Sequence, residues 1–143
     1  MWHFEHTEST TATAAQIWAL YADPTRWPEW DEGLTRVSID GPFAAGTTGT
    51  IKPTGGPTFR YVLAEVTPLR SFADVTRLPL AGLRFTHEIT PTAAGHDVTQ
   101  RVDFEGPLGW LFAKMMGRSL TVDMPETMRR LLRRAESALS ASA

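Results

Sequence analysis

The sequence predicts an α+β fold in which a curved antiparallel sheet of seven strands wraps around one long C-terminal helix. Two observations lead to this prediction. Six short strand-like runs follow one another between residues 34 and 105, and turn-forming glycine and proline separate them, which favours an antiparallel meander. The chain then ends in a long helical pattern, from about residue 107 to residue 141. A sheet curled around a single helix encloses space, so an internal small-molecule cavity is the first functional hypothesis.

The first elements are a strand over residues 2–10 and a helix over residues 14–22. Thr11 or Thr13 can cap this helix, because a threonine hydroxyl accepts hydrogen bonds from the unpaired N–H groups of the first turn. Pro24 then begins another helical turn, since proline is favoured at the first helical position. Two short helices are therefore expected between the first and second strands.

The remaining strands are expected over residues 34–40, 47–52, 58–67, 70–78, 83–90 and 96–105. The last two show their faces most clearly, because apolar residues such as Val98 and Val102 alternate with charged ones. One face is therefore buried and the other is in water. His87 and Gln100 break this pattern, because they are polar residues on the apolar faces.

The C-terminal helix is expected to open at Pro107 and to bury one apolar stripe. Pro125 lies inside it and removes one hydrogen bond, so a kink is expected near residues 121–122. Gly117, on the buried stripe, costs roughly 1 kcal/mol of helix propensity. A closely packed strand or the space for a ligand would compensate for that cost.

Turn lengths predict which residues face one another in the sheet. If the loop at residues 79–82 contains four residues, Asp74 lies opposite His87, and the next turn places His87 opposite Gln100. These three side chains would then form a line across adjacent strands and point at the helix. Two further polar residues lie one step along this line: Tyr61 and Thr76.

This polar row has three interpretations. In the functional one, it orients a ligand in an apolar cavity, and Asp74 fixes the tautomer of His87, whose other nitrogen bonds a ligand or moves a proton. In the second, the row is a buried polar cluster that satisfies itself. In the third, the strand over residues 70–78 slips by one residue and sends Asp74 to solvent.

The other candidate ligand contacts are mostly large apolar side chains. Trp30 belongs to a stiff, proline-rich aromatic segment that either forms the rim of a pocket or packs as core. Methionines of the C-terminal helix suit an irregular cavity, although methionine in a helical stripe also serves as plain core. The candidate ligand-binding residues are Trp30, Tyr61, Thr76, Phe85, His87, Gln100, Trp110, Met115, Gly117 and Met124, and the candidate catalytic residues, if the protein is an enzyme, are His87 and Asp74.

Composition disfavours several classes of protein. A net charge of −2 provides no basic surface for nucleic acid, and the lack of cysteine removes disulfides and thiol nucleophiles. No apolar run approaches the roughly 20 residues of a membrane-spanning helix. The N-terminus shows no basic and apolar leader pattern, so a cytoplasmic location is expected. We also expect no metal, no cofactor and a monomer or homodimer.

The order of these elements resembles that of the START-like, helix-grip superfamily, which includes the polyketide cyclase/dehydrase and lipid-transport family. The segments that carry the resemblance are residues 14–24, 27–30, 46–49, 61–68 and 131–136. It implies a single ligand-binding domain over residues 1–139, followed by a flexible tail over residues 140–143. The family has no universal catalytic triad, so the resemblance transfers no catalytic residue.

Three functions are consistent with this sequence. The first is binding of a hydrophobic or aromatic small molecule, such as a lipid, sterol or polyketide, in an internal cavity. The second is an enzyme of the polyketide cyclase/aromatase kind, in which His87 transfers a proton. The third is a domain that binds a protein partner without a ligand.

Overall fold

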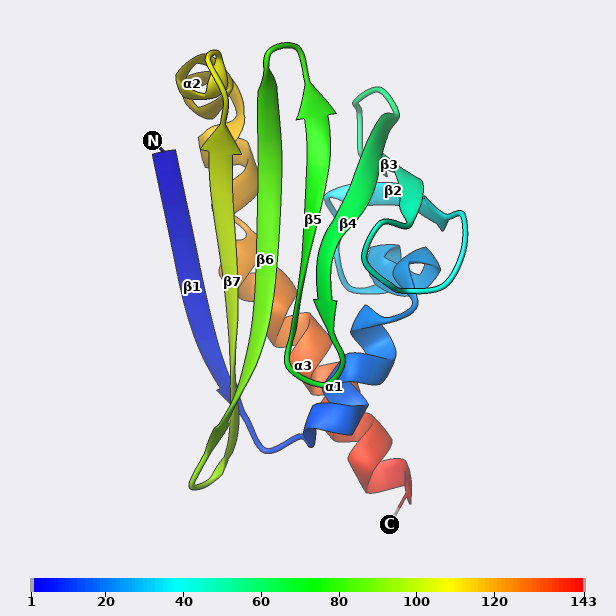
Figure 1. Cartoon of the computed structure of the whole chain (residues 1–143). Helices are drawn as coiled ribbons and strands as arrows, with labels where there is room; N and C mark the ends of the chain where they lie inside the picture. Colours follow the sequence, from blue (N-terminus) through cyan, green and yellow to red (C-terminus); the bar gives the residue numbers. More distant parts are fainter. Residues whose placement is uncertain (1, 143) are drawn as a thin grey trace.

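The computed structural model describes the backbone of residues 2–142 and the side chains of residues 3–137. Within this range, seven strands form one curled antiparallel sheet in the spatial order β1-β7-β6-β5-β4-β3-β2 (Figure 1). The strands are β1 (Trp2–Thr10), β2 (Leu34–Ile39), β3 (Thr48–Pro53), β4 (Phe59–Thr67), β5 (Ser71–Leu78), β6 (Ala81–Thr92) and β7 (Gly95–Glu105). The predicted fold class is confirmed.

The helices lie on the concave side of this sheet, where α3 crosses behind the central strands (Figure 1). They are α1 (Ala14–Tyr21), the 3₁₀ helix η1 (Pro24–Glu29), α2 (Gly109–Thr121) and α3 (Met124–Ser142). Thr13, not Thr11, caps α1: its hydroxyl accepts from the Gln16 amide, and the Gln16 side chain accepts from the Thr13 amide. The flexible tail at residues 140–143 stays a prediction; the backbone of 140–142 continues α3, and residue 143 lies outside the described residues.

The single kinked C-terminal helix of the sequence prediction is two helices in the structure. The predicted position of the disruption is correct, because α2 ends at Thr121 and α3 begins at Met124. Pro125 is the second residue of α3 and has no N–H to donate to the carbonyl of Thr121, so a continuous helix loses a hydrogen bond there. At the end of α2, the Thr121 hydroxyl donates a hydrogen bond to the Gly117 carbonyl, at 2.8 Å.

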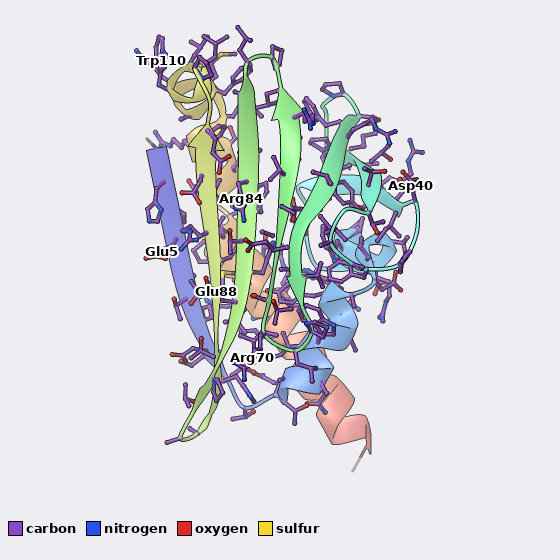
Figure 2. All side chains as sticks on the ribbon, viewed as in Figure 1. Glu5, Asp40, Arg70, Arg84, Glu88 and Trp110 are labelled. Atoms are coloured by element: carbon purple, nitrogen blue, oxygen red, sulfur yellow. The ribbon has the colours of Figure 1, made fainter. Side chains whose placement is uncertain are left out.

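The two faces of the sheet differ as the alternation in the last strands predicts. Val98, Val102 and Phe104 are almost completely buried beneath the helices. The outer face carries charged side chains, among them Arg84 and Glu88 (Figure 2). The concave face is therefore the apolar side of the sheet, and α3 covers it.

The register between β5 and β6 differs from the prediction by two residues. Leu78 pairs with Ala81, so the turn contains two residues and not four. Asp74 therefore lies opposite Phe85, while His87 lies opposite Phe72. Because side chains alternate with a period of two, this shift leaves Asp74 on the buried face and makes it a diagonal neighbour of His87.

The β6–β7 register is the predicted one, with His87 opposite Gln100. Leu80 explains why the predicted length of the β5–β6 turn is wrong. This residue has a φ of 54°, a left-handed conformation that leucine rarely adopts, so the sequence does not indicate a two-residue turn here.

Candidate ligand-binding cavity

A cavity of about 400 Å³ lies between the concave face of the sheet and the junction of α2 and α3. Its apolar walls include Trp27, Leu34, Phe59, Leu83, Phe85 and Leu120. The exposed residues among its lining mark the mouth, and they come from three distant parts of the sequence: Glu32, Gly33, Thr54, Ser119 and Asp123. The cavity therefore opens where the η1–β2 segment, the end of β3 and the α2–α3 junction meet.

Four polar side chains enter this cavity from the sheet. Asp74 and Thr76 come from β5, His87 from β6 and Gln100 from β7. Asp74, Thr76 and His87 are buried, yet the structure records no hydrogen bond from any described residue to the side chains of these four. The prediction of a self-satisfied cluster is therefore wrong for the described part of the chain.

His87 is held by aromatic rings. Its imidazole stacks on Phe72, with ring centroids 4.3 Å apart and planes within 9°, and Tyr21 lies 5.1 Å away. The Nδ1 atom is buried and has no hydrogen-bond partner among the described residues. Burial lowers the pKa of His87 to about 3, so the ring is neutral at physiological pH.

Asp74 approaches His87 without forming a hydrogen bond to it. The Oδ2 of Asp74 lies 3.9 Å from the Nε2 of His87, which exceeds hydrogen-bonding distance. The prediction that Asp74 fixes the tautomer of His87 is therefore wrong in this geometry, because the two residues are diagonal and not opposite. Burial raises the pKa of Asp74 to about 7, and the charge of Arg84 opposes this rise. Between about pH 3 and pH 7 both members of the pair are consequently neutral.

The predicted ligand-binding residues divide into three groups. Thr76, Phe85, His87, Gln100 and Met124 line the cavity. Trp30, Tyr61 and Gly117 are buried but are not part of its lining. Trp110 and Met115 are 65% and 66% exposed, so the prediction that they face the interior is wrong.

The geometry of α2 explains the two exposed residues. Ala113 and Gly117 form the buried face of this helix. Met115 is two residues from each and therefore lies on the opposite side. Trp110 stands on α2 at the end of the molecule where the β5–β6 turn also lies (Figure 2). An apolar run on all sides of a helix identifies a covering segment, but does not tell which side faces the sheet.

Tyr61 is turned away from the cavity by a hydrogen bond. Its hydroxyl donates to the Ser38 carbonyl at 2.7 Å, and it crosses β3 at Gly49, which has no side chain. Sequence reasoning also missed several lining residues. Trp27, and not Trp30, contributes the aromatic wall from η1, and Asp31 and Asp123 add carboxyl groups that no apolar periodicity could reveal.

The described residues contain neither a membrane-spanning helix nor a metal-binding cluster. No helix in the described range is long and apolar enough to span a membrane. Among the same residues, no group of three or more His, Asp or Glu side chains is arranged to hold a metal ion.

Solved structures share this fold. The di-domain ARO/CYC StfQ from the steffimycin biosynthetic pathway matches 96% of this chain and 51% of its own, with a TM-score of 0.77 and 17% identity. Ara h 8.0201 matches 95% of this chain and 98% of its own, with a TM-score of 0.74 and 11% identity. Truncated norcoclaurine synthase from Thalictrum flavum matches 96% of this chain and 92% of its own, with a TM-score of 0.68 and 15% identity. Identities this low show similarity of fold alone.

Sequence comparison identifies the family. An uncharacterized protein of Mycobacterium bovis and one of Mycobacterium tuberculosis are 36% identical to this chain over 55 residues, which is 37% of this chain and 33% of each relative. The match thus spans about a third of the length of these curated relatives. The family described as polyketide cyclase/dehydrase and lipid transport matches residues 1–136. This chain belongs to that family.

Proposed function

We propose that the protein binds a hydrophobic or aromatic small molecule, of the lipid, sterol or polyketide kind, inside the cavity between the sheet and the α2–α3 junction. The observation that carries this proposal is the row of polar side chains without hydrogen-bond partners among the described residues, on the otherwise apolar wall that β5, β6 and β7 contribute. The cavity volume of about 400 Å³ falls within the usual range for ligand pockets, roughly 300–1,000 Å³.

The energetics of the cavity favour a ligand with one polar group on an apolar body. Each buried polar group left without a partner costs about 1–3 kcal/mol, so a ligand hydroxyl or carbonyl that bonds the row recovers part of that cost. The aromatic and aliphatic walls add about 25 cal/mol for each Å² of apolar surface that leaves water. The apolar walls thus supply affinity, and Thr76, His87 and Gln100 supply orientation.

Two neighbouring methionines of α2 provide a matched test of this proposal. Met116 lines the cavity, whereas Met115 is exposed on the same helix. We expect 1-naphthalenemethanol, a flavonoid or a sterol to raise the melting temperature of the wild-type protein. Met116→Trp should abolish this shift by filling the cavity, and Met115→Trp should preserve it. A shift that survives Met116→Trp, or no shift with any of the compounds, would contradict the proposal.

A second candidate function is proton-transfer catalysis on a polyketide-like substrate. The observation that favours it is the pKa of Asp74, which burial raises to about 7, a value suited to a general acid or base at neutral pH. His87 is less suited to that role than the sequence suggests, because burial keeps its ring neutral. In this function Asp74 transfers the proton and His87 hydrogen-bonds the substrate.

Turnover measurements distinguish the two functions. A poly-β-ketone thioester should cyclise faster with the enzyme than without it, and its rate should change with pH around 7. Asp74→Asn should abolish this acceleration while the thioester still protects the variant against thermal unfolding. Equal cyclisation rates with and without the protein would leave the binding function alone.

A further inference from the structure

Carboxyl groups outnumber basic groups around the cavity. Among the described residues, Arg130 is the only arginine or lysine in its lining, and the His87 ring is neutral. Five carboxyl groups share the same lining, and they belong to Asp31, Glu32, Asp74, Asp123 and Glu126. An excess of one sign of charge around a low-dielectric cleft concentrates ligands of the opposite sign.

Arginines balance only part of this negative charge. The Arg130 guanidinium lies 3.6 Å from Glu32 and 3.7 Å from Glu126, and Glu126 also pairs with Arg129 and Arg133 outside the lining. Among the described residues, no arginine or lysine forms an ion pair with the remaining three carboxyl groups, those of Asp31, Asp74 and Asp123. They come from the η1–β2 segment, from β5 and from the α2–α3 junction, so they surround the cavity from three sides.

Asp74 gives the strongest indication of the charge that a ligand of this cavity carries. It lines the cavity, is only 3% exposed and receives no hydrogen bond from the described residues. The ionisable groups around it do not compensate for its burial: His87 on β6 is neutral, and Tyr61 on β4 keeps its proton because burial and the charge of Asp74 raise its pKa. Arg84 on β6 lowers the pKa of Asp74 but forms its ion pair with Glu65.

The walls and the spacing of the acids indicate an organic cation. Trp27, Phe59 and Phe85 present aromatic rings to the cavity, and aromatic faces attract ammonium groups. The carboxyl groups are too dispersed to surround one metal ion, because no three acidic or histidine side chains of the described residues form a metal cluster. A cation with a bulky apolar body matches both features.

We propose that the ligand of this cavity is a hydrophobic or aromatic amine, whose ammonium group pairs with Asp74 and whose apolar body lies against the aromatic walls. Asp123 at the mouth and Asp31 next to it attract the same cation. This inference rests on the proposed function, because it names the class of molecule that the same cavity binds.

Three probes with one ring system test the charge preference directly. 1-Naphthylmethylamine is a cation, 1-naphthalenemethanol is neutral and 1-naphthoate is an anion, while their size and shape are nearly equal. By calorimetry at pH 8, we expect the amine to bind at least about tenfold more tightly than the alcohol, because an ion pair in a buried site exceeds a neutral hydrogen bond. The anion should bind more weakly than the alcohol.

Variants assign the preference to named carboxyl groups. Asp74→Asn should remove the preference, so that the amine and the alcohol bind this variant with nearly equal affinity. Asp123→Asn at the exposed mouth keeps the size of the side chain and should weaken the binding of the amine more than that of the alcohol. Asp40→Asn, outside the cavity lining and paired with Arg60, is the matched control and should change neither affinity. Circular dichroism verifies that each variant is folded.

The pH dependence provides an independent readout. Because the pKa of Asp74 is about 7 and an aliphatic amine stays protonated well above that value, the affinity for the amine should rise between pH 6 and pH 8. Asp74→Asn should remove this rise. An alcohol that binds as tightly as the amine, or an amine preference that survives Asp74→Asn, overturns the inference and leaves the proposed function intact. Failure of all three probes to bind overturns both.

Discussion

At the scale of single residues, the candidate site is a set of polar side chains that the fold buries without giving them hydrogen-bond partners among the described residues. Asp74 and His87 have diagonal positions on adjacent strands, with Oδ2 and Nε2 3.9 Å apart. Burial raises the pKa of Asp74 and lowers the pKa of His87, and both shifts favour the neutral form of the side chain. A neutral pair of this kind stabilises the protein less than an ion pair with good geometry would. Its carboxyl and imidazole groups can instead form hydrogen bonds with a molecule that enters the cavity.

The pKa of Asp74 implies a pH dependence of stability with a definite sign. Its value is raised from 3.8 to about 7 on folding, so the stabilising effect of its proton is fully present below pH 3.8 and is lost as the pH rises through 7. Asp74→Asn imitates the protonated form. Relative to the wild-type protein, it should raise the free energy of unfolding by a few kcal/mol at pH 8, at about 1.4 kcal/mol for each pKa unit, and by much less at pH 5.

Urea unfolding of both proteins at the two pH values measures this difference. His87 titrates in the opposite direction, because its lowered pKa makes stability fall as the pH drops below 6.5, but it is present in both proteins and cancels in the comparison. Thr76→Val, a change of cavity lining without a titratable group, is the control and should shift stability equally at both pH values. An equal shift for Asp74→Asn would show that Asp74 is ionised throughout.

Gly49 supports a second prediction at this scale. A β-carbon at this position would overlap the Ser38 carbonyl oxygen and would lie 2.6 Å from the Tyr61 hydroxyl oxygen. Gly49→Ala should therefore lower the free energy of unfolding by several kcal/mol, since backbone has to move. Gly82→Ala, in β6, is the matched control, because its β-carbon meets Val75 at an ordinary 3.5 Å. Equal losses in the two variants, measured by urea unfolding, would refute this account.

At the scale of elements, capping and alternation could be predicted from the sequence because they depend on neighbouring residues. The cap of α1, the position of the α2–α3 break and the buried face of β7 all follow from local patterns. The β5–β6 register could not, because it depends on a left-handed turn at Leu80. The orientation of α2 could not either, because residues such as Trp110 and Met115 are apolar on the face that is exposed.

The cap of α1 gives a prediction at this scale. Thr13 accepts a hydrogen bond from the Gln16 amide at 3.2 Å and completes a capping box. Thr13→Ala should lower the free energy of unfolding by about 1 kcal/mol, the usual cost of a lost N-cap. Thr11→Ala, in the same loop, should leave it nearly unchanged, and similar losses in both variants would show that the loop and not the cap determines stability.

At the scale of the whole molecule, most of the fold could be predicted, and half of the ten predicted ligand-binding residues line the cavity. Thr76, Phe85, His87, Gln100 and Met124 were found from the alternation of strands and the stripe of a helix, which identify the concave side. The mouth could not be predicted, because Glu32, Thr54 and Asp123 come together only when three distant segments meet. Their carboxyl and hydroxyl groups belong to surface loops, in which hydrophobic periodicity carries no information.

The construction of the mouth leads to the last prediction. Because residues 31–34, 53–54 and 119–127 all contribute lining residues, a molecule in the cavity contacts the three segments at once. A bound ligand such as 1-naphthalenemethanol should therefore slow amide hydrogen exchange in all three together, since local opening of any one must release it. The β6–β7 turn, at the opposite end of the sheet from α2 (Figure 1), is the internal control and should exchange at an unchanged rate. Protection confined to α2, on the side of Trp110 and Met115, would place the ligand on the outer surface and not in the cavity.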